Sequence, residues 1–140
     1  MRKISIITVV KNGMPLLREA IKSFDNQKYD NKEHIIIYSS SSDDTEKYLH
    51  SKKSNNRFII KDANTGNKFD SINLGFKKST GVVIGLLHAD DIFYDHNILS
   101  NVMKNFENNI NFLYGNIRII SNNHLIRNWI AGDFNIKNVK

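Results

Sequence analysis

The sequence predicts an α/β protein in which a mostly parallel β-sheet carries helices on both faces, followed by a pair of strands near the C-terminus. Three observations favour this fold class. Apolar segments of strand length alternate four times with segments that have apolar residues at helical spacing, the pattern of parallel strands joined by right-handed crossovers. The strand segments are almost continuously apolar, as expected for strands buried on both faces. Polar residues directly follow several of these strands, at the edge of the sheet where such folds bind ligands.

The first half of the chain contains three of the predicted strands. Residues 4–10, ISIITVV, form a β-branched run, and Pro15 suits the first position of the helix that follows. Asp43, with Glu46 three residues later, marks the start of a second helix. The predicted strands here are 4–10, 33–38 and 57–60, and the apolar helical positions are Leu17, Ala20, Ile21 and Phe24, then Tyr48 and Leu49.

The second half continues the alternation and ends in two strands. A helix that carries Phe69, Ile72 and Phe76 on one face stops at Gly81, and the apolar segment 82–87 forms the fourth strand. The remaining predicted elements are a helix with Leu99, Val102, Met103 and Phe106, and two strands within 111–120 and 124–130 joined by Ser121-Asn122-Asn123.

Length and composition predict one ordinary globular domain over residues 1–140. The chain has no cysteine, which excludes disulfides and thiolate chemistry. The formal net charge of +6 favours an anionic partner, whether nucleic acid, anionic lipid or a phosphate-bearing small molecule, although it also serves solubility. No segment reaches the roughly 20 apolar residues of a membrane span, and the apolar run near the N-terminus is short for a signal peptide and lacks a cleavage site. We therefore expect a cytoplasmic protein.

Two adjacent aspartates, Asp90 and Asp91, stand where the fourth predicted strand ends. One interpretation is a turn with a helix cap, but a cap needs one aspartate and the next helix begins nearer Asp95. A second interpretation is a site for Mg²⁺ or Mn²⁺, which prefer carboxylate oxygens and often keep waters and substrate phosphates as further ligands. A third, a receiver-type phosphorylation pocket, needs acids after the first strand, where this chain has Lys11 and Asn12.

The order of four segments resembles the N-terminal half of the family 2 glycosyltransferases, which are inverting enzymes of the GT-A fold that use nucleotide-sugars. The segments are ISIITVVKN, IIIYSSSSDDT, FDSINLGFKKSTGVVIGLLHADD and YGNIRII. The resemblance covers nearly the whole chain, and its most specific element is STG followed by a strand and ADD. It implies hexosyl transfer from a UDP- or GDP-linked donor to a glycan or lipid-linked acceptor, in cell-surface polysaccharide or glycolipid synthesis. It also implies peripheral contact with the inner face of the plasma membrane and no nucleic-acid partner.

The resemblance assigns roles to individual residues. Asp91 is implied as a ligand of the divalent metal, Mg²⁺ or Mn²⁺, that clamps the donor diphosphate, and Asp90 as a contact of the ribose or of the metal's waters. Thr8 and Asn12 match the first loop of the family, which lies against the nucleotide. Asn73 matches a polar position of the helix before the fourth strand and is expected to reach the donor, although a solvated helix face explains this residue equally well.

Two features depart from the family pattern. The family's second strand ends on an aspartate that pairs with the uracil ring, whereas this chain has Tyr38, which can stack on or hydrogen-bond a base but offers no carboxylate. An inverting transfer also needs a general base, which in the family lies further along the chain than the part matched here. His124 and Asp133 are the late candidates, neither lies in a matching motif, and the catalytic residue stays unknown. We therefore expect a truncated acceptor half. Two other functions stay open: a nucleotide-sugar-binding fragment that needs a partner chain, and a basic nucleic-acid-binding domain.

Overall fold

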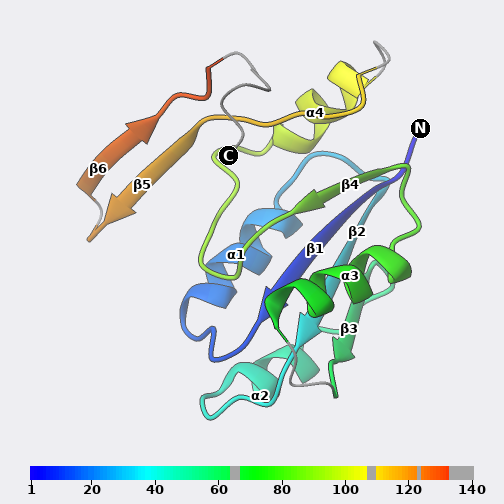
Figure 1. Ribbon diagram of the computed structural model, residues 1–140, viewed down its shortest axis with the longest axis vertical. Coiled ribbons are helices and arrows are strands. Elements are labelled where there is room, and N and C mark those ends of the chain that lie inside the picture. Colours follow the sequence, from blue (N-terminus) through cyan, green and yellow to red (C-terminus); the bar gives the residue numbers. More distant parts are fainter. Residues whose placement is uncertain (64–66, 107–109, 123, 133–140) are drawn as a thin grey trace. The chain divides into compact units, whose positions relative to one another are not determined.

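A computed structural model describes residues 1–63, 67–106, 110–122 and 124–132 of the chain. The chain divides into two compact units, Met1–Glu107 and Asn108–Lys140, and each is described by itself. A single domain over residues 1–140 therefore stays a prediction. The elements are β1 (Ile4–Val10), α1 (Leu16–Asp25), β2 (Lys32–Tyr38), α2 (Thr45–His50), β3 (Arg57–Lys61), α3 (Lys68–Lys78), β4 (Val83–Leu86) and α4 (Ile98–Phe106) in the first unit, and β5 (Ile117–Ser121) and β6 (His124–Trp129) in the second (Figure 1).

The first unit is built on a parallel sheet with the strand order β3-β2-β1-β4 (Figure 1). The central strand β1 pairs with β2 along its whole length and with β4 over Ile4–Ile7, where Ile7 lies opposite Leu86. Strands β2 and β3 follow one another on one side of β1, and the chain then crosses to the other side to form β4. The strand order therefore reverses between β1 and β4, the position at which open α/β sheets bind their ligands.

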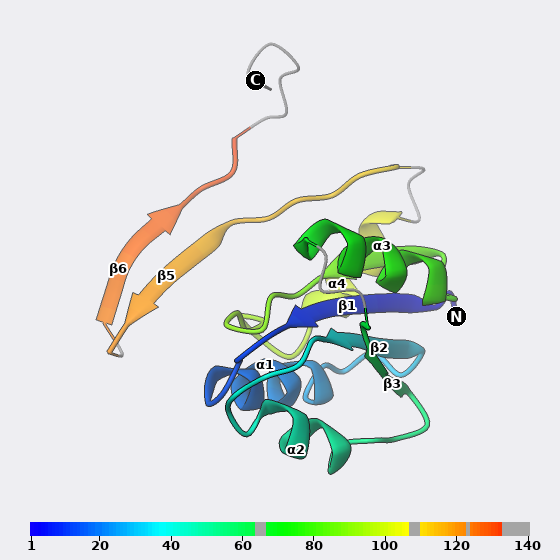
Figure 2. The ribbon, with the colours of Figure 1, turned by 60° about the horizontal axis from the view of Figure 1, so that its bottom comes forward.

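Helices cover both faces of this sheet, as the sequence predicts. On one face, Phe24 of α1, Leu49 of α2 and Leu99 of α4 are completely or almost completely buried in the apolar clusters. On the other face, Leu74 of α3 packs against a cluster that includes Ile7 of β1. Figure 2 shows α3 on the opposite side of the sheet from α1 and α2. None of the helices in the described part of the chain is both long and apolar enough to cross a membrane.

The fourth strand is less buried than its apolar sequence predicts. It extends over Val83–Leu86 rather than 82–87, and Ile84 and Leu86 are 37% and 49% exposed. The reason is that β4 is the edge strand of the sheet, whereas α3 packs over β1 and β2. A continuous apolar run thus predicted burial on two faces where the described structure covers one.

The predicted buried face of α3 is also wrong. Phe69 and Phe76, at helical spacing, are 71% and 44% exposed, and the buried residues are Ser71 and Gly75. A Cβ added at Gly75 would lie 2.5 Å from Cγ2 of Ile7, so that the helix approaches the sheet through its smallest side chains. The large side chains of α3 are consequently left on its outer surface.

A buried carboxylate holds the amino edge of the sheet together. Glu33, which is 1% exposed, accepts hydrogen bonds from Ser5 Oγ (2.6 Å), from the backbone nitrogen and hydroxyl of Thr80 (2.7 and 2.9 Å), and an ion pair from Lys3 (2.7 Å). The Gly81 nitrogen donates to Ser5 Oγ at 2.8 Å, and a Cβ at Gly81 would lie 2.7 Å from the Ser5 nitrogen. The STG segment therefore fixes the position at which β4 joins β1.

The second unit contains an antiparallel strand pair, which confirms the predicted pair near the C-terminus. Ile117 lies opposite Trp129, and a bulge interrupts the register between Ile119 and Ile120. Asn122, in the turn, has a φ of 48°, a left-handed conformation that asparagine tolerates. Strand β5 begins at residue 117, later than the apolar segment 111–120 indicates.

Candidate functional site

Three loops meet at the carboxyl edge of the parallel sheet. The loop after β1 begins at Lys11, the loop after β2 begins at Ser39, and the loop after β4 contains the segment His88–Asp91. Because the strands are parallel, these loops share one edge, and the first and third flank the point where the strand order reverses. The edge predicted from the sequence is therefore present.

Asn12 connects the first two of these loops. Its φ of 52° places it in the left-handed region, where asparagine is enriched among non-glycine residues. Its Oδ1 accepts from the Ser42 nitrogen at 2.8 Å and from the Ser42 hydroxyl at 3.3 Å, and its own nitrogen donates to Ser41 Oγ at 3.1 Å. The side chain is otherwise exposed, so Asn12 fixes both loops and stays accessible to a ligand.

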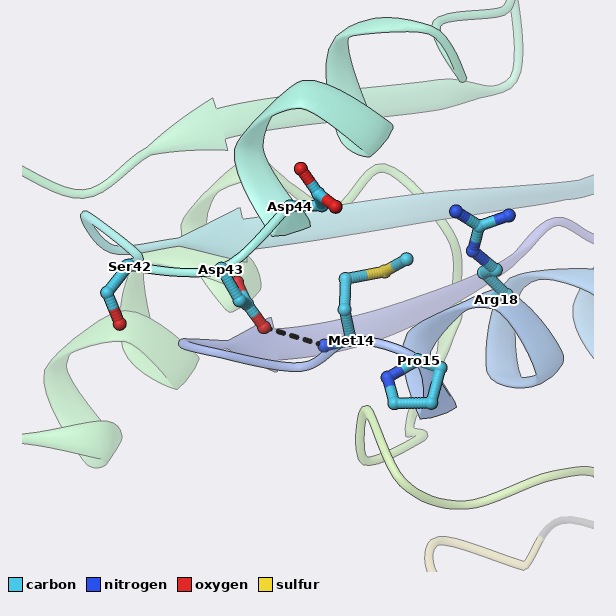
Figure 3. Close-up of a pocket in the computed structure, with 6 residues that line it drawn as sticks. All are labelled: Met14, Pro15, Arg18, Ser42, Asp43 and Asp44. Carbon is cyan, nitrogen blue, oxygen red and sulfur yellow. Dashed lines mark hydrogen bonds between the residues drawn. The ribbon is translucent and has the colours of Figure 1, made fainter.

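Asp43 adds a second connection between the same loops. Its Oδ2 accepts from the Met14 nitrogen at 2.9 Å (Figure 3), and its Oδ1 accepts from the nitrogen of Thr45, the first residue of α2. The interactions with Thr45 and with the Met14 amide outweigh burial and lower the pKa of Asp43. The Gly13 nitrogen also donates to Thr45 Oγ1 at 2.9 Å. The open pocket drawn in Figure 3 lies over this junction and is lined by Met14, Pro15, Arg18, Ser42, Asp43 and Asp44.

Tyr38, predicted to face the nucleotide, packs beneath α2. It is 5% exposed, and its hydroxyl lies 3.4 Å from Glu46 Oε1 and 3.3 Å from His50 Nε2, both on that helix. Burial and the neighbouring carboxylate of Glu46 raise the pKa of Tyr38. The side chain thus fastens α2 to the end of β2, and a direct contact with a base stays a prediction.

Thr8 and Asn73 lie in different environments. Thr8 is fully buried, and its hydroxyl donates to the carbonyl of Leu87 at 2.8 Å and lies 2.9 Å from His34 Nε2. Asn73 is exposed on α3. Thr8 therefore connects β1 to the end of β4 from within the core. Nucleotide contacts by either residue stay predictions.

Asp90 and Asp91 lie in a tight turn after β4. The Asp91 nitrogen donates to the His88 carbonyl at 3.1 Å, which closes a four-residue turn, and both aspartate side chains are exposed. Helix α4 begins at residue 98, and it is Asp95 that accepts from the backbone nearby, from the Asn97 nitrogen at 2.6 Å. The predicted turn is thus present, but neither carboxylate of the pair caps the helix.

The acidic turn is held against β1 and its loop. The Leu87 nitrogen donates to the Ile7 carbonyl at 3.0 Å, one residue beyond the last ladder pair of β4. Ala89 packs beside Gly13, since a Cβ added at Gly13 would lie 3.7 Å from Cβ of Ala89. The two carboxylates consequently lie next to the loop after β1, at the reversal of strand order.

The donor chemistry of the pair fits a divalent cation that is shared with a substrate. Among the described residues, no group of three or more His, Cys, Asp or Glu side chains could hold a metal ion by itself. Mg²⁺ and Mn²⁺ are commonly held by one or two carboxylates together with waters and substrate phosphates. Asp90 and Asp91 offer that partial set of ligands.

The two late candidates for a general base both fall in the sequence of the second unit. His124 lies at the start of β6, in the second unit, with Nδ1 2.8 Å from the Asn122 carbonyl. Asp133 lies outside the described residues. His34, which contacts Thr8, was not among the predicted site residues, although a polar histidine within the apolar strand β2 was visible in the sequence.

The comparisons with known proteins agree with this geometry. The family described as Glycosyl transferase family 2 matches residues 5–136. Among solved structures, S. aureus TarS 1-349 in complex with UDP has a TM-score of 0.69 at 18% identity and covers 76% of this chain and 32% of that chain. The mannosyltransferase PcManGT from Pyrobaculum calidifontis, in complex with GDP-Man and Mn²⁺, has a TM-score of 0.66 at 19% identity and covers 74% and 32%. The fold is therefore that of the GT-A glycosyltransferases.

Curated relatives with higher sequence identity are also glycosyltransferases. An uncharacterized glycosyltransferase of Rickettsia bellii is 33% identical over 80% of this chain and 16% of the relative. The Escherichia coli UDP-Glc:alpha-D-GlcNAc-diphosphoundecaprenol beta-1,3-glucosyltransferase WfgD is 30% identical over 91% of this chain and 51% of the relative. The chain belongs to glycosyltransferase family 2, and it spans between about a sixth and a half of the length of these two relatives.

Proposed function

We propose that this chain forms the donor-binding part of an inverting, metal-dependent glycosyltransferase. The reaction would transfer a hexosyl group from a UDP- or GDP-linked sugar to a glycan or lipid-linked acceptor, in the synthesis of a cell-surface polysaccharide or glycolipid. It would take place in the cytoplasm, with peripheral contact at the inner face of the plasma membrane. Family membership supports sugar transfer in general. The name of the E. coli relative supports a lipid-linked acceptor, and the neighbours with UDP, UDP-GlcNAc and GDP-Man support a nucleotide-sugar donor.

The observation that carries the proposal is the exposed carboxylate pair, Asp90 and Asp91, in a turn at the reversal of strand order. Two carboxylates would repel the diphosphate of a nucleotide-sugar unless a divalent cation lay between them. Asp91 would hold this ion, and Asp90 would contact the ribose or the waters of the ion. When bound, the ion would stabilise negative charge on the departing diphosphate.

The other predicted residues would act in two ways. Asn12 and Asn73 are exposed, so their amide groups could contact the nucleotide directly. Thr8 and Tyr38 are buried, and their hydroxyls are bonded inside the protein, so they would act by holding the end of β4 and the start of α2 in place. The site would thus consist of an exposed set of ligands on loops that buried side chains fix.

Titration calorimetry with UDP and with GDP, each with and without Mn²⁺, tests the proposal. We expect one nucleotide to bind only when Mn²⁺ is present, and Asp91→Ala to weaken this binding at least tenfold because a ligand of the ion is lost. Asp30→Ala is the matched control, since Asp30 is an exposed carboxylate just before β2, near the opposite edge of the sheet. It should bind as the unaltered protein does.

The outcomes separate the candidate functions. Equal nucleotide binding by Asp91→Ala and by the unaltered protein would remove the proposed site. Mn²⁺-dependent binding together with donor hydrolysis, or transfer to a lipid-linked sugar, would support an enzyme. Binding without either reaction would support a nucleotide-sugar-binding part that needs a partner chain. Salt-sensitive binding to DNA or RNA, in place of nucleotide binding, would favour the nucleic-acid-binding alternative.

A further inference from the structure

A histidine lies at the centre of the sheet without an evident catalytic use. His34, on β2, is completely buried, its ring lies 4.4 Å from the ring of Phe24 between centroids, and it pairs in register with Arg57 of β3. Burial first, and the positive charge of Arg57 second, lower the pKa of His34 to about 3. The imidazole is therefore neutral at neutral pH.

The hydrogen bonds of Thr8 fix which nitrogen of this ring carries the proton. A threonine hydroxyl has one proton, and Thr8 donates it to the Leu87 carbonyl at 2.8 Å. The contact of 2.9 Å between Thr8 Oγ1 and His34 Nε2 must then be a hydrogen bond in which Nε2–H donates. The result is a chain of two hydrogen bonds that runs from His34 on β2 through Thr8 on β1 to the Leu87 carbonyl at the end of β4.

Only one of the two ring nitrogens of His34 forms a hydrogen bond among the described residues. Nδ1 of His34 has no hydrogen-bond partner among the described residues, and the same is true of Nε of Arg57. An unpaired buried polar atom costs free energy that an apolar side chain of similar size would avoid. The Nε2–H donor is therefore what the imidazole supplies at this position.

The chain of hydrogen bonds ends at Leu87, the residue before the acidic turn. The Leu87 nitrogen is bonded to Ile7 and the Leu87 carbonyl to Thr8, so both backbone groups of this residue are held by β1. The following residue, His88, accepts the hydrogen bond from Asp91 that closes the turn. A shift of the Leu87 peptide would thus move both carboxylates relative to the loop after β1.

We propose that His34 is a positioning residue for the acidic turn: by donating to Thr8, it directs the Thr8 hydroxyl to the Leu87 carbonyl and so fixes the placement of Asp90 and Asp91. This inference concerns the same site as the proposed function and rests on it for its consequence in nucleotide binding. The placement of the turn itself can be measured without a ligand.

Amide hydrogen exchange of the Leu87 and Asp91 nitrogens, measured without ligand, tests the placement. We expect Thr8→Val and His34→Leu each to accelerate exchange at both amides about tenfold, since each substitution removes one hydrogen bond of the chain. In Thr8→Ser and His34→Gln the exchange rates should stay within about threefold of those of the unaltered protein. Serine keeps the hydroxyl, and glutamine keeps a donor near the position of Nε2. In the double variant Thr8→Val with His34→Leu, exchange should be no faster than in Thr8→Val alone, because both side chains act through the same chain of hydrogen bonds.

Ser5→Ala is the matched control for general loosening of the sheet. Ser5 is another fully buried hydroxyl on β1, but it bonds to Glu33 and Gly81 at the opposite edge. This variant should leave exchange at Asp91 unchanged. Three results would overturn the inference. Exchange at Asp91 could be accelerated as much by Ser5→Ala as by Thr8→Val, or the accelerations of the two single variants could add up in the double variant. Exchange in His34→Gln could also be as fast as in His34→Leu.

Calorimetry with Mn²⁺ and UDP on the same variants, or with GDP if that is the nucleotide the unaltered protein binds, gives the functional consequence. Thr8→Val and His34→Leu should weaken Mn²⁺-dependent UDP binding about tenfold, and Thr8→Ser and His34→Gln should restore it. If the unaltered protein binds neither UDP nor GDP while the exchange pattern is as expected, the proposed function fails and the positioning role stands. If UDP binding is strong and unchanged in His34→Leu, the positioning role fails and the proposed function stands.

Discussion

Glu33 at the amino edge of the parallel sheet and the acidic turn Asp90-Asp91 at the carboxyl edge use their carboxylates in opposite ways. At the amino edge, Glu33 is buried, and Ser5, Lys3 and Thr80 donate to its oxygens. At the carboxyl edge, the acidic turn exposes both of its carboxylates, while the loops around it are held by backbone bonds and by the side chains of Asn12, Asp43 and Thr8. A carboxylate whose oxygens are all bonded inside the protein contributes to folding, whereas an exposed one in a fixed loop is available to a ligand.

The largest expected effect is the removal of the buried carboxylate. Glu33→Ala leaves the donors of Ser5, Lys3 and Thr80 without their acceptor, and we expect the free energy of unfolding to fall by roughly 3 kcal/mol. Urea unfolding measures this loss, with Glu19→Ala, an exposed glutamate on α1, as the control. The folded fraction of the Glu33 variant should bind Mn²⁺ and UDP normally. If binding were lost while the protein stayed folded, the two edges would not be independent.

The pH dependence of stability sharpens the same comparison. Burial alone would raise the pKa of Glu33, but the bonds from Lys3, Ser5 and Thr80 outweigh it and lower the pKa from 4.5 to about 2. Because the folded-state pKa is the lower one, this stabilisation is complete above pH 4.5 and is lost as the pH falls toward 2. At about 1.4 kcal/mol per unit, it amounts to roughly 3 kcal/mol.

Urea midpoints measured between pH 7 and pH 2.5 test this dependence. The unaltered protein should lose stability more steeply below pH 4.5 than Glu33→Gln, which has no proton to gain at this position. Parallel curves for the two proteins would contradict the assignment of the acid-labile stability to Glu33.

A smaller effect is expected where β4 joins β1 at the amino edge. Gly81→Ala would place a Cβ 2.7 Å from the Ser5 nitrogen and 2.9 Å from the Ile4 carbonyl carbon, so backbone atoms must shift. We expect a loss of about 2 kcal/mol in the free energy of unfolding. Gly115→Ala is the control, because no atom of the described residues lies within 4 Å of the Cβ it would add. Equal unfolding midpoints for the two variants would show that this junction tolerates movement.

The sequence predicted the parts of the fold that depend on local pattern. The strand runs, the helix positions and the acidic turn after β4 followed from apolar spacing and from residues that favour turns. The pattern could not reveal that β4 is an edge strand, since strand order is a property of the whole chain, and so the burial of Ile84 was overestimated. It also placed Phe76 rather than Gly75 against the sheet, because apolar periodicity does not register the close approach that a glycine permits.

The candidate site was predictable to a similar degree. The acidic pair and the loop residue Asn12 lie at one edge of the sheet, as expected for residues that directly follow parallel strands. The directions of the side chains were not predictable. Thr8 and Tyr38 point into the protein, where they bond to Leu87 and to α2. Such bonds join residues in different elements of the fold, and one sequence alone does not show which donor meets which acceptor.

The smallest expected effect on stability comes from the pair that the proposed function needs most. Asp90→Asn and Asp91→Asn each change an exposed side chain, and the bond that closes the turn runs between backbone atoms, so the free energy of unfolding should stay within about 0.5 kcal/mol of the original. The double variant should be no less stable, because the repulsion between neighbouring carboxylates is removed. Mn²⁺-dependent UDP binding by Asp91→Asn should nevertheless fall at least tenfold. A loss of stability comparable to that of Glu33→Ala would show that these acids are structural, and the contrast between the two edges would no longer hold.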